Sequence, residues 1–424
     1  MKNFLKILVI ITILPFLYIS VSANGLNLNG IGSRASGMGT AYIGLSDDFS
    51  AVFFNPAGLS QIEETSLSVF VTDLIPKGTY KFELMGITLA DAKTVNSMYP
   101  SGSISYFKPF SKKLVAGIAL YVPSGAGAKW SGDELKMLTG GKPYTWDSTI
   151  FMITLSPAAA YKFSEKFSIG ASINLNYVTL NMERPGGDGS TIPFFQYSEK
   201  MSKFALGATV GLMYKPTKKL SFGLTLKAPV KASITGTAKA PFLANLGLAA
   251  ESKGTREATW PLWLGMGVAF KPTDRITITA DVTYSEWFSL QNIPVKFDEL
   301  SWKFAGMDEG SEFILNWDNT IDYKIGIEYK LSDTFALRGG YYTDHSPSPE
   351  ETLNIMLPSI DYRGVTLGFG YKKGKIRTDF ALEYLSGRSR TVNPMNYYAG
   401  AGMPGVHGMK IIVPNITISY VFGK

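Results

Sequence analysis

Asp344-His345-Ser346 contains the three side-chain types of a catalytic triad. Consecutive residues at the end of a strand point to opposite faces, so these three cannot pass a proton along a relay. The chain has one other histidine, His407, and no cysteine. The lack of cysteine excludes disulfides and cysteine metal sites. We therefore expect no enzymatic activity, no metal site and no catalytic residue.

A second stretch that could bind a ligand is rich in glycine and lies near the N-terminus. Gly30, Gly32 and Gly37 imitate the spacing of a nucleotide-binding loop. In such a loop a strand precedes the glycines and a helix follows them, and the sequence predicts neither here. We expect no nucleotide or other cofactor. Residues 24–59 hold too many glycines to form a helix or strand, so we expect them to be ordered only inside a surrounding structure.

Six copies of a short cassette divide the rest of the chain. Each copy reads aromatic residue, lysine, a few turn-forming residues and an apolar residue, which is typical of a tight hairpin. Six hairpins give twelve strands, and one further strand at each end, near 65–73 and 410–422, gives fourteen. An even number suits a closed bacterial barrel. The cassettes are residues 107–114, 161–167, 214–220, 270–276, 329–335 and 371–376.

The runs between the cassettes alternate apolar and polar residues, most clearly at 167–177 and 276–284. A period of two gives each strand one apolar face. The runs are long enough for tilted membrane strands, which need about 9–11 residues. With 13% aromatic residues and 43 glycines, the pattern predicts an all-β, fourteen-stranded antiparallel transmembrane β-barrel. A secreted soluble β-protein is the alternative.

The N-terminus has the features of a secretory signal peptide, with Lys2 and Lys6 before an apolar run and a cut expected after Ala23. A retained membrane anchor is the alternative. Removing the two lysines lowers the net charge from +7 to +5. This mild excess, which we take to be spread along the chain, does not suggest a nucleic-acid partner.

The tryptophans favour a membrane orientation. All seven lie in or beside the long connections between hairpins, whereas Tyr and Phe mark the short-turn ends. Aromatic belts are expected at both interfaces of a barrel, so we predict that the tryptophans form the outer belt. They are Trp130, Trp146, Trp260, Trp263, Trp287, Trp302 and Trp317.

The predicted interior of the barrel is charged. Charges that face lipid at mid-depth cost about 2–4 kcal/mol for Arg or Lys. The alternate strand positions that hold the polar residues must therefore face inward. Fourteen strands leave space for a plug, and residues 24–59 are the segment left to fill it. The inward charges are Asp281, Asp322, Lys324, Glu328, Arg338, Arg377, Asp379 and Glu383.

Residues 37–41 and 47–59, which include Asn55-Pro56-Ala57, are the most distinctive part of the sequence. With them the chain resembles, over its whole mature length, the FadL family of outer-membrane long-chain fatty acid transporters, and these residues look like the family's N-terminal hatch with its Asn-Pro-Ala signature. The resemblance implies a signal peptide at 1–23, a hatch at 24–63 and a barrel at 64–424. It also implies that the hatch gate includes Asn24, Gly25, Asn55, Pro56 and Ala57.

Family members take up hydrophobic substrates passively and release them sideways, through a gap where the third strand kinks beside the Asn-Pro-Ala turn. Here the third strand is residues 114–123. Pro123 cannot donate to the ladder, and Gly125 and Gly127 follow it. The resemblance therefore implies a lateral opening at Pro123, Gly125 and Gly127. The alternative is that Pro123 simply ends the strand.

A fatty carboxylate in a low-dielectric lumen needs a cation. The candidates are Lys324, Arg338 and Arg34, unless they pair with neighbouring carboxylates. The partners implied are a long-chain fatty acid or other hydrophobic small molecule, outer-membrane lipid and the barrel assembly machinery, and we expect a monomer. Aromatic hydrocarbons, which some relatives carry, are an open alternative. A diffusion porin is less favoured because it would lack a hatch.

Overall fold

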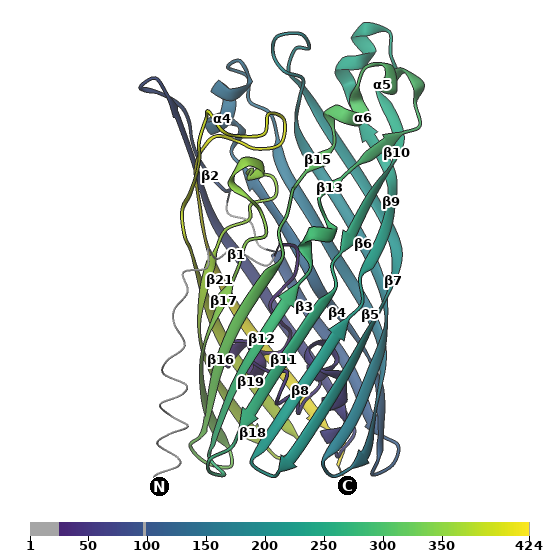
Figure 1. Cartoon of the computed structure of the whole chain (residues 1–424), viewed down its shortest axis with the longest axis vertical. Helices are drawn as coiled ribbons and strands as arrows, with labels where there is room; N and C mark the ends of the chain where they lie inside the picture. Colours follow the sequence, from purple (N-terminus) through teal and green to yellow (C-terminus); the bar gives the residue numbers. More distant parts are fainter. Residues whose placement is uncertain (1–24, 96–98, 424) are drawn as a thin grey trace.

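Figure 1 shows a tall closed barrel with the N-terminal segment (dark purple) inside its lower half. The structure is a computed structural model that describes residues 25–95 and 99–423. The predicted signal peptide and Asn24 lie outside the described residues. Within the described part of the chain, no helix is long and apolar enough to cross a membrane.

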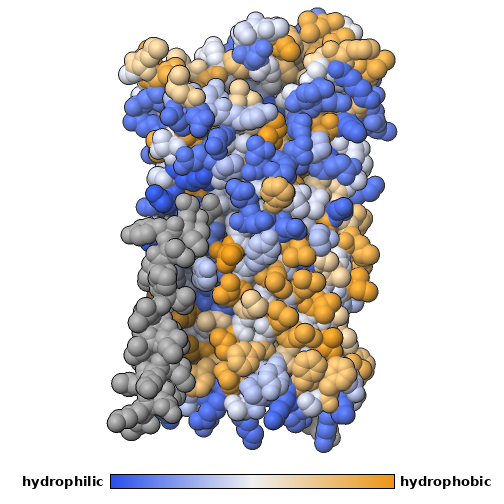
Figure 2. Space-filling view, viewed as in Figure 1, coloured by the Kyte–Doolittle hydropathy of each residue, from blue (hydrophilic) through white to orange (hydrophobic). Residues whose placement is uncertain are grey.

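Alternation along the sequence produces the strands. In β16 (Thr320–Lys330) each second side chain from Thr320 to Glu328 is buried and each one between them is exposed. The exposed set is Ile and Tyr, and the buried set includes Asp322 and Lys324. The predicted inward charges are therefore on the lumenal face, where all but Arg377 are buried. Figure 2 shows the matching exterior, with mainly apolar residues over the lower half of the visible wall.

Fourteen antiparallel strands close the barrel, as the cassettes predicted. The first strand pairs with both its successor and the last strand, which removes the open edge. Two of the strands are interrupted and carry two labels each. In chain order the strands are β1 (Ser66–Leu84), β3 (Tyr99–Pro109), β4 (Leu114–Trp130), β5 (Trp146–Ser164), β6 (Phe167–Gly186), β7 (Phe195–Thr217), β8 with β9 (Leu220–Lys227, Val230–Lys239), β10 with β11 (Glu251–Trp260, Trp263–Phe270), β12 (Ile276–Ser285), β16, β17 (Phe335–Asp344), β18 (Tyr362–Lys373), β19 (Ile376–Gly387) and β21 (Gly405–Val421).

Smaller elements lie at the long-connection end of the barrel and in its lumen. The additional strands are β2 (Ile87–Lys93), β13 (Asn292–Ile293), β14 (Val295–Phe297), β15 (Phe313–Ile314) and β20 (Arg390–Val392). The helices are α2 (Ser33–Gly37), α3 (Ala51–Phe54), η1 (Pro56–Gln61), α4 (Gly132–Leu135), η2 (Lys136–Thr139), η3 (Pro241–Leu246), η4 (Trp287–Ser289), α5 (Leu300–Phe304), α6 (Met307–Gly310) and η5 (Glu350–Thr352).

The wall extends further than the sequence predicted. The first strand was predicted near 65–73, but β1 continues to Leu84 and the chain returns through β2. Strand β7 is 23 residues long, about twice what a tilted membrane strand needs. On the face that Figure 2 shows, the upper part of the wall is mainly polar and forms a blue band above the apolar region. The barrel therefore projects beyond the apolar zone at the long-connection end.

The predicted tryptophan belt is wrong. All seven indoles are buried, and six of them belong to one apolar cluster in the upper lumen. The positions of the tryptophans in the sequence indicated the correct end of the barrel but not whether the side chains face the lumen or the outside. The indoles fill space inside the wide upper barrel, where they bury apolar area that short side chains would leave as voids. The Tyr and Phe girdle at the short-turn end does face outward.

Candidate functional site

The N-terminal segment (residues 25–62) packs against lumenal faces on opposite sides of the barrel. Its first helix, α2, lies against β17, β18, β19 and β21, and η1 lies against β4, β5, β6 and β7. The expectation that this stretch holds no helix is wrong, because α2, α3 and η1 are single turns within it. Isolated helices this short are unstable in water, so packing against the wall must hold them.

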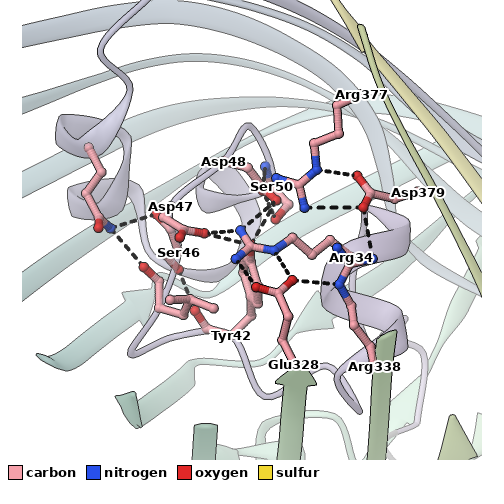
Figure 3. Close-up of polar contacts among 12 residues, drawn as sticks. Arg34, Tyr42, Ser46, Asp47, Asp48, Ser50, Glu328, Arg338, Arg377 and Asp379 are labelled. Carbon is pink, nitrogen blue, oxygen red and sulfur yellow. Dashed lines mark hydrogen bonds and ion pairs between the residues drawn. The ribbon is translucent and has the colours of Figure 1, made fainter. Parts of the chain in front are cut away.

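A buried ion cluster fixes this segment to the wall (Figure 3). Arg34 donates to both carboxylate oxygens of Glu328, from Nε at 2.8 Å and from its terminal nitrogen at 2.9 Å. Arg338 also donates to Glu328, at 2.7 Å, and pairs with Asp379 at 2.9 Å. The other terminal nitrogen of Arg34 bonds Asp47. Removing one partner of such a buried pair typically costs about 3–5 kcal/mol.

Six lumenal glycines let the segment approach the strand backbones. A Cβ atom at any of them would lie between 2.1 and 2.6 Å from an atom of residues 38–56. Each therefore needs hydrogen in place of a side chain. They sit on six different strands, so the contact surrounds much of the lumen. They are Gly170, Gly211, Gly223, Gly267, Gly326 and Gly340.

The Asn-Pro-Ala corner is part of this contact. The Asn55 side chain accepts from the Ala57 N–H at 3.1 Å and donates to the Ile43 and Leu212 carbonyls at 3.2 and 2.9 Å. Its oxygen lies where a Cβ of Gly211 would be. The corner thus faces β6, β7 and β8. The expectation that it lies directly behind the β4 kink is not what the structure has, because residues 26–28 lie there instead.

The wall is interrupted beside β4. Its ladder with β3 ends at the pair Ser103 and Tyr121, and among the described residues β3 supplies no partner above that point. Strand β4 does not end at Pro123; its pairing with β5 shifts register there and continues to Trp130. On the open side, Leu28 N–H donates to the Pro123 carbonyl at 3.0 Å and Gly125 N–H donates to the Leu26 carbonyl at 2.9 Å.

A cavity of about 430 Å³ lies at this interruption. It is bounded by Gly25 and residues 27–30 of the N-terminal segment, by Gly125 and Gly127 of β4, and by lumenal side chains of β17 to β21. Most of its lining is apolar or glycine. The predicted opening residues Gly125 and Gly127 and the gate residue Gly25 thus meet at one cavity that reaches from the lumen to the wall.

A second, smaller cavity of about 80 Å³ lies on the other side of residues 27–29. Its lining includes Lys227 and Lys324 and, within the described residues, no Asp or Glu. The Lys227 ammonium lies 3.4 Å from the Phe53 ring centre and 4.4 Å from that of Trp263. Lys324 donates to the Asn29 carbonyl at 3.4 Å. Neither lysine forms an ion pair in the described part of the chain.

The sequence-predicted cations therefore separate into two groups. Arg34 and Arg338 are held in the ion cluster, whereas Lys324 lies at the small cavity. Lys227 was missed, although its alternation with Phe222, Leu224 and Leu226 places it on the inward face of β8.

A kink in the opposite wall bounds the small cavity. Pro229 separates β8 from β9, and Pro261 separates β10 from β11. At this kink the Trp260 indole reaches across the lumen and donates to the Ser124 hydroxyl at 2.7 Å. Ser124 in turn donates to the Leu26 carbonyl at 2.6 Å. The interruption in β4, the N-terminal segment and the far wall are thus joined by two hydrogen bonds.

The triad-like residues have separate partners. His345 Nδ1 lies 2.8 Å from Asp322, and the Ser346 hydroxyl bonds the carbonyl of Ser359 at 3.0 Å. Asn29 donates to Asp344 at 2.8 Å. The three side chains point to different neighbours, as their positions at a strand end predicted.

Comparison with known proteins identifies the class. The model of the family described as "Outer membrane protein transport protein (OMPP1/FadL/TodX)" matches residues 16–422. Outer membrane protein P1 of Haemophilus influenzae is 21% identical over 89% of this chain and 92% of its own. A Pseudomonas aeruginosa FadL homologue superposes with a TM-score of 0.79 at 18% identity, covering 94% of this chain and 100% of its own. The Pseudomonas putida toluene transporter TodX superposes with a TM-score of 0.73 at 18% identity, covering 95% and 100%.

The chain therefore belongs to the FadL/TodX family of outer-membrane transport proteins. This assignment places it in the outer membrane as a transporter of hydrophobic compounds. The structural similarity at this level of identity concerns the fold.

Proposed function

We propose that this protein takes up long-chain fatty acids, or similar amphipathic molecules with an anionic head, by passive diffusion. The observation that carries the proposal is the pair Lys227 and Lys324 beside a cavity whose lining, among the residues that the structure describes, includes no acidic side chain. A charged group away from water is costly unless it is paired. A carboxylate is the complement to two ammonium groups that form no ion pair in the described part of the chain, and an apolar tail suits the larger cavity next to it.

Release is sideways through the interruption beside β4. Each methylene kept out of water is worth about 0.8 kcal/mol, so an acyl chain that passed through the periplasm would lose that for every methylene. The cavity of about 430 Å³ lies beside Gly125 and the open side of β4. A tail that lies there has a direct path into lipid. This geometry supports lateral release. In this proposal residues 25–30 act as the gate.

Uptake of aromatic hydrocarbons is the second candidate. Phe53, Tyr121, Trp260 and Trp263 line the small cavity, and a flat ring could pack against them. This protein also shares its fold with TodX, a toluene transporter. An aromatic hydrocarbon would leave both lysines unpaired, so we rank it second.

Competition binding separates the two candidates. Purified mature protein would be loaded with a fluorescent fatty acid and titrated with oleate, with methyl oleate and with toluene. We expect oleate to displace the probe and methyl oleate, which has the same tail without the charge, to do so at least about tenfold less well. Equal displacement by oleate and methyl oleate would reject the carboxylate site, and displacement by toluene alone would favour the hydrocarbon.

A further inference from the structure

The excess positive charge of this protein lies at one end of the barrel. The six hairpin cassettes contain 14 Lys or Arg and three acidic residues, a surplus of 11, whereas the whole chain has a net charge of +7. The remaining residues are therefore net acidic, at −4. The expectation that the excess is spread along the chain is wrong. The blue row along the lower rim in Figure 2 is this end.

These charges are free to meet a partner. Eleven of the 14 side chains are exposed, and the other three, Lys162, Lys215 and Lys271, are half-buried at the mouth. Within the described residues, none of the eleven forms an ion pair. Every one of the six hairpins contributes at least one of the eleven exposed charges. Three hairpins contribute a single one each, namely Lys166, Arg275 and Lys330. We call this set the basic ring.

The basic ring lies at the depth of the membrane surface. Its hairpin turns leave only two to five residues between consecutive strands, so they cannot reach far from the wall. Exposed aromatic rings occupy the same ends of the strands, including Tyr161, Tyr214, Phe270 and Phe335. Aromatic residues of a barrel sit at the level of the lipid head groups. Flexible lysine side chains beside them extend to the same level.

From this geometry we infer that the basic ring binds the phosphates of anionic phospholipids in the leaflet at the short-turn end, which in outer-membrane barrels faces the periplasm. Clusters of Lys and Arg next to a membrane attract anionic head groups. The charges surround the perimeter and alternate with lipid-facing aromatic rings. A shell of lipid contacts such a perimeter on all sides, whereas a protein docked on one face would meet only some of the hairpins. The inference does not depend on which substrate the protein carries.

The test removes one charge from each hairpin. The ring variant carries Lys112→Gln, Lys166→Gln, Lys218→Gln, Arg275→Gln, Lys330→Gln and Lys373→Gln. The control variant removes the same number of exposed charges at the opposite end, at Lys136, Lys142, Lys200, Lys253, Lys296 and Lys303, each to Gln. Both must first show the mobility shift between unboiled and boiled samples that reports a folded barrel.

The readout is lipid retention by native mass spectrometry, from micelles with equal amounts of phosphatidylglycerol and phosphatidylcholine. We expect wild-type and control proteins to retain phosphatidylglycerol in preference, on the order of tenfold, and the ring variant to lose most of that preference. Raising the salt to about 1 M should weaken it in the wild type, because screening shortens the reach of exposed charges.

Two outcomes would overturn the inference. One is equal retention of both lipids by the wild type, and the other is the same loss of preference in the ring and control variants. Poly-glutamate, added as a competitor, tests whether the basic ring binds an acidic protein instead of lipid. Ring-dependent binding of poly-glutamate without a phosphatidylglycerol preference would reject the lipid and indicate such a protein.

Discussion

Lys227 packs its ammonium against aromatic rings and forms no ion pair in the described part of the chain. Its ammonium lies over the Phe53 and Trp263 rings, and cation–π contacts attract a cation without neutralising it. We expect Lys227→Ala to weaken oleate binding by about 10- to 100-fold, because a hydrogen bond to a charged group is worth about 1.5–3 kcal/mol. Toluene and methyl oleate binding should stay unchanged.

Lys227→Arg is the control for this substitution, since it keeps the charge and the ring contacts. Titrations monitored by tryptophan fluorescence would measure both ligands, because Trp263 lies beside the site. If Lys227→Ala and Lys324→Ala each leave the oleate affinity unchanged, the two lysines are structural and the carboxylate site is wrong.

Sequence parity predicted which charges face inward but not which of them are paired. Arg338, Glu328 and Lys324 follow from alternation along regular strands, and the structure buries all three. Arg338 pairs with Asp379 and shares Glu328 with Arg34, and Arg34 belongs to a segment without periodicity. Its position is set by packing inside the barrel, a tertiary property that no local pattern encodes. The ligand cations were therefore predictable only as a set of candidates.

Asp361 makes the connection after β17 sensitive to pH. Burial raises the pKa of its carboxyl to about 6, and the neighbouring Arg390 and His345 only partly oppose this. Because the pKa is above that of an unfolded aspartate, Asp361 stabilises the ordered connection most below about pH 4. That contribution is lost as the pH rises through about 6. We expect amide exchange in residues 345–361 to be faster at pH 8 than at pH 5, after correction for intrinsic rates.

Asp361→Asn keeps the shape of the side chain and removes the titration, so its exchange should depend less on pH than that of the wild type. The partner groups are Ser346, whose N–H donates to the carboxyl at 3.3 Å, and Arg390. Identical pH profiles for the two proteins would show that Asp361 does not control this connection.

At the scale of elements, the proposed lateral release depends on β4 and the N-terminal segment. Gly125 has room for a side chain, since an added Cβ would meet nothing nearer than 3.7 Å, whereas at Gly127 it would lie 2.1 Å from the Ser148 carbonyl. We therefore expect Gly125→Phe to fill the opening without distorting β4. Cells that depend on the variant should fail to grow on oleate as sole carbon source while the barrel inserts normally.

Gly310→Phe is the matched control, because an added Cβ there meets no atom within 4 Å and the residue lies in α6, far along the chain from β4. Normal growth of Gly125→Phe cells, with the variant folded in the outer membrane, would reject lateral release at this position. Ala57→Trp would be a weaker test of lateral release. Ala57 is fully buried against the wall near Ser168, so extra bulk there disturbs packing first.

The element count was predictable because each hairpin turn contains its own local signal. Turn residues such as those after Pro109 and around Gly374 act through backbone conformation, which short sequences encode. Strand length and the inward direction of the tryptophans were not predictable in the same way. Both depend on how wide the upper lumen is and on what fills it. Gly326 and Gly340 are a further feature that the sequence predicts only in part. Alternation marks both as lumenal, but only the folded N-terminal segment explains why a side chain cannot fit there.

At the scale of the whole molecule, the barrel and its N-terminal segment form one packed body. The ion cluster joins Arg34 to β16 and β17, and the six lumenal glycines join residues 38–56 to six strands. Such contacts leave little space for water to cross near the short-turn end. A transporter that releases its substrate through the wall has no need of an open channel, so a closed lumen is compatible with function.

This view predicts the electrical behaviour of the protein. In planar bilayers the wild type should show conductance near zero, whereas deletion of residues 25–62 should produce large, steady channels, because fourteen strands enclose a lumen wide enough for water.

Because the deletion could impair assembly, Gly340→Val serves as a second variant. An added side chain there would collide with Gly39 N at 2.1 Å, and overpacking of this kind costs about 1–3 kcal/mol. It should therefore loosen the segment and give intermittent openings. Both variants must keep the mobility shift of a folded barrel in unboiled samples. Steady high conductance of the wild type would indicate a diffusion porin, and silence of both folded variants would show that the N-terminal segment is not what closes the lumen.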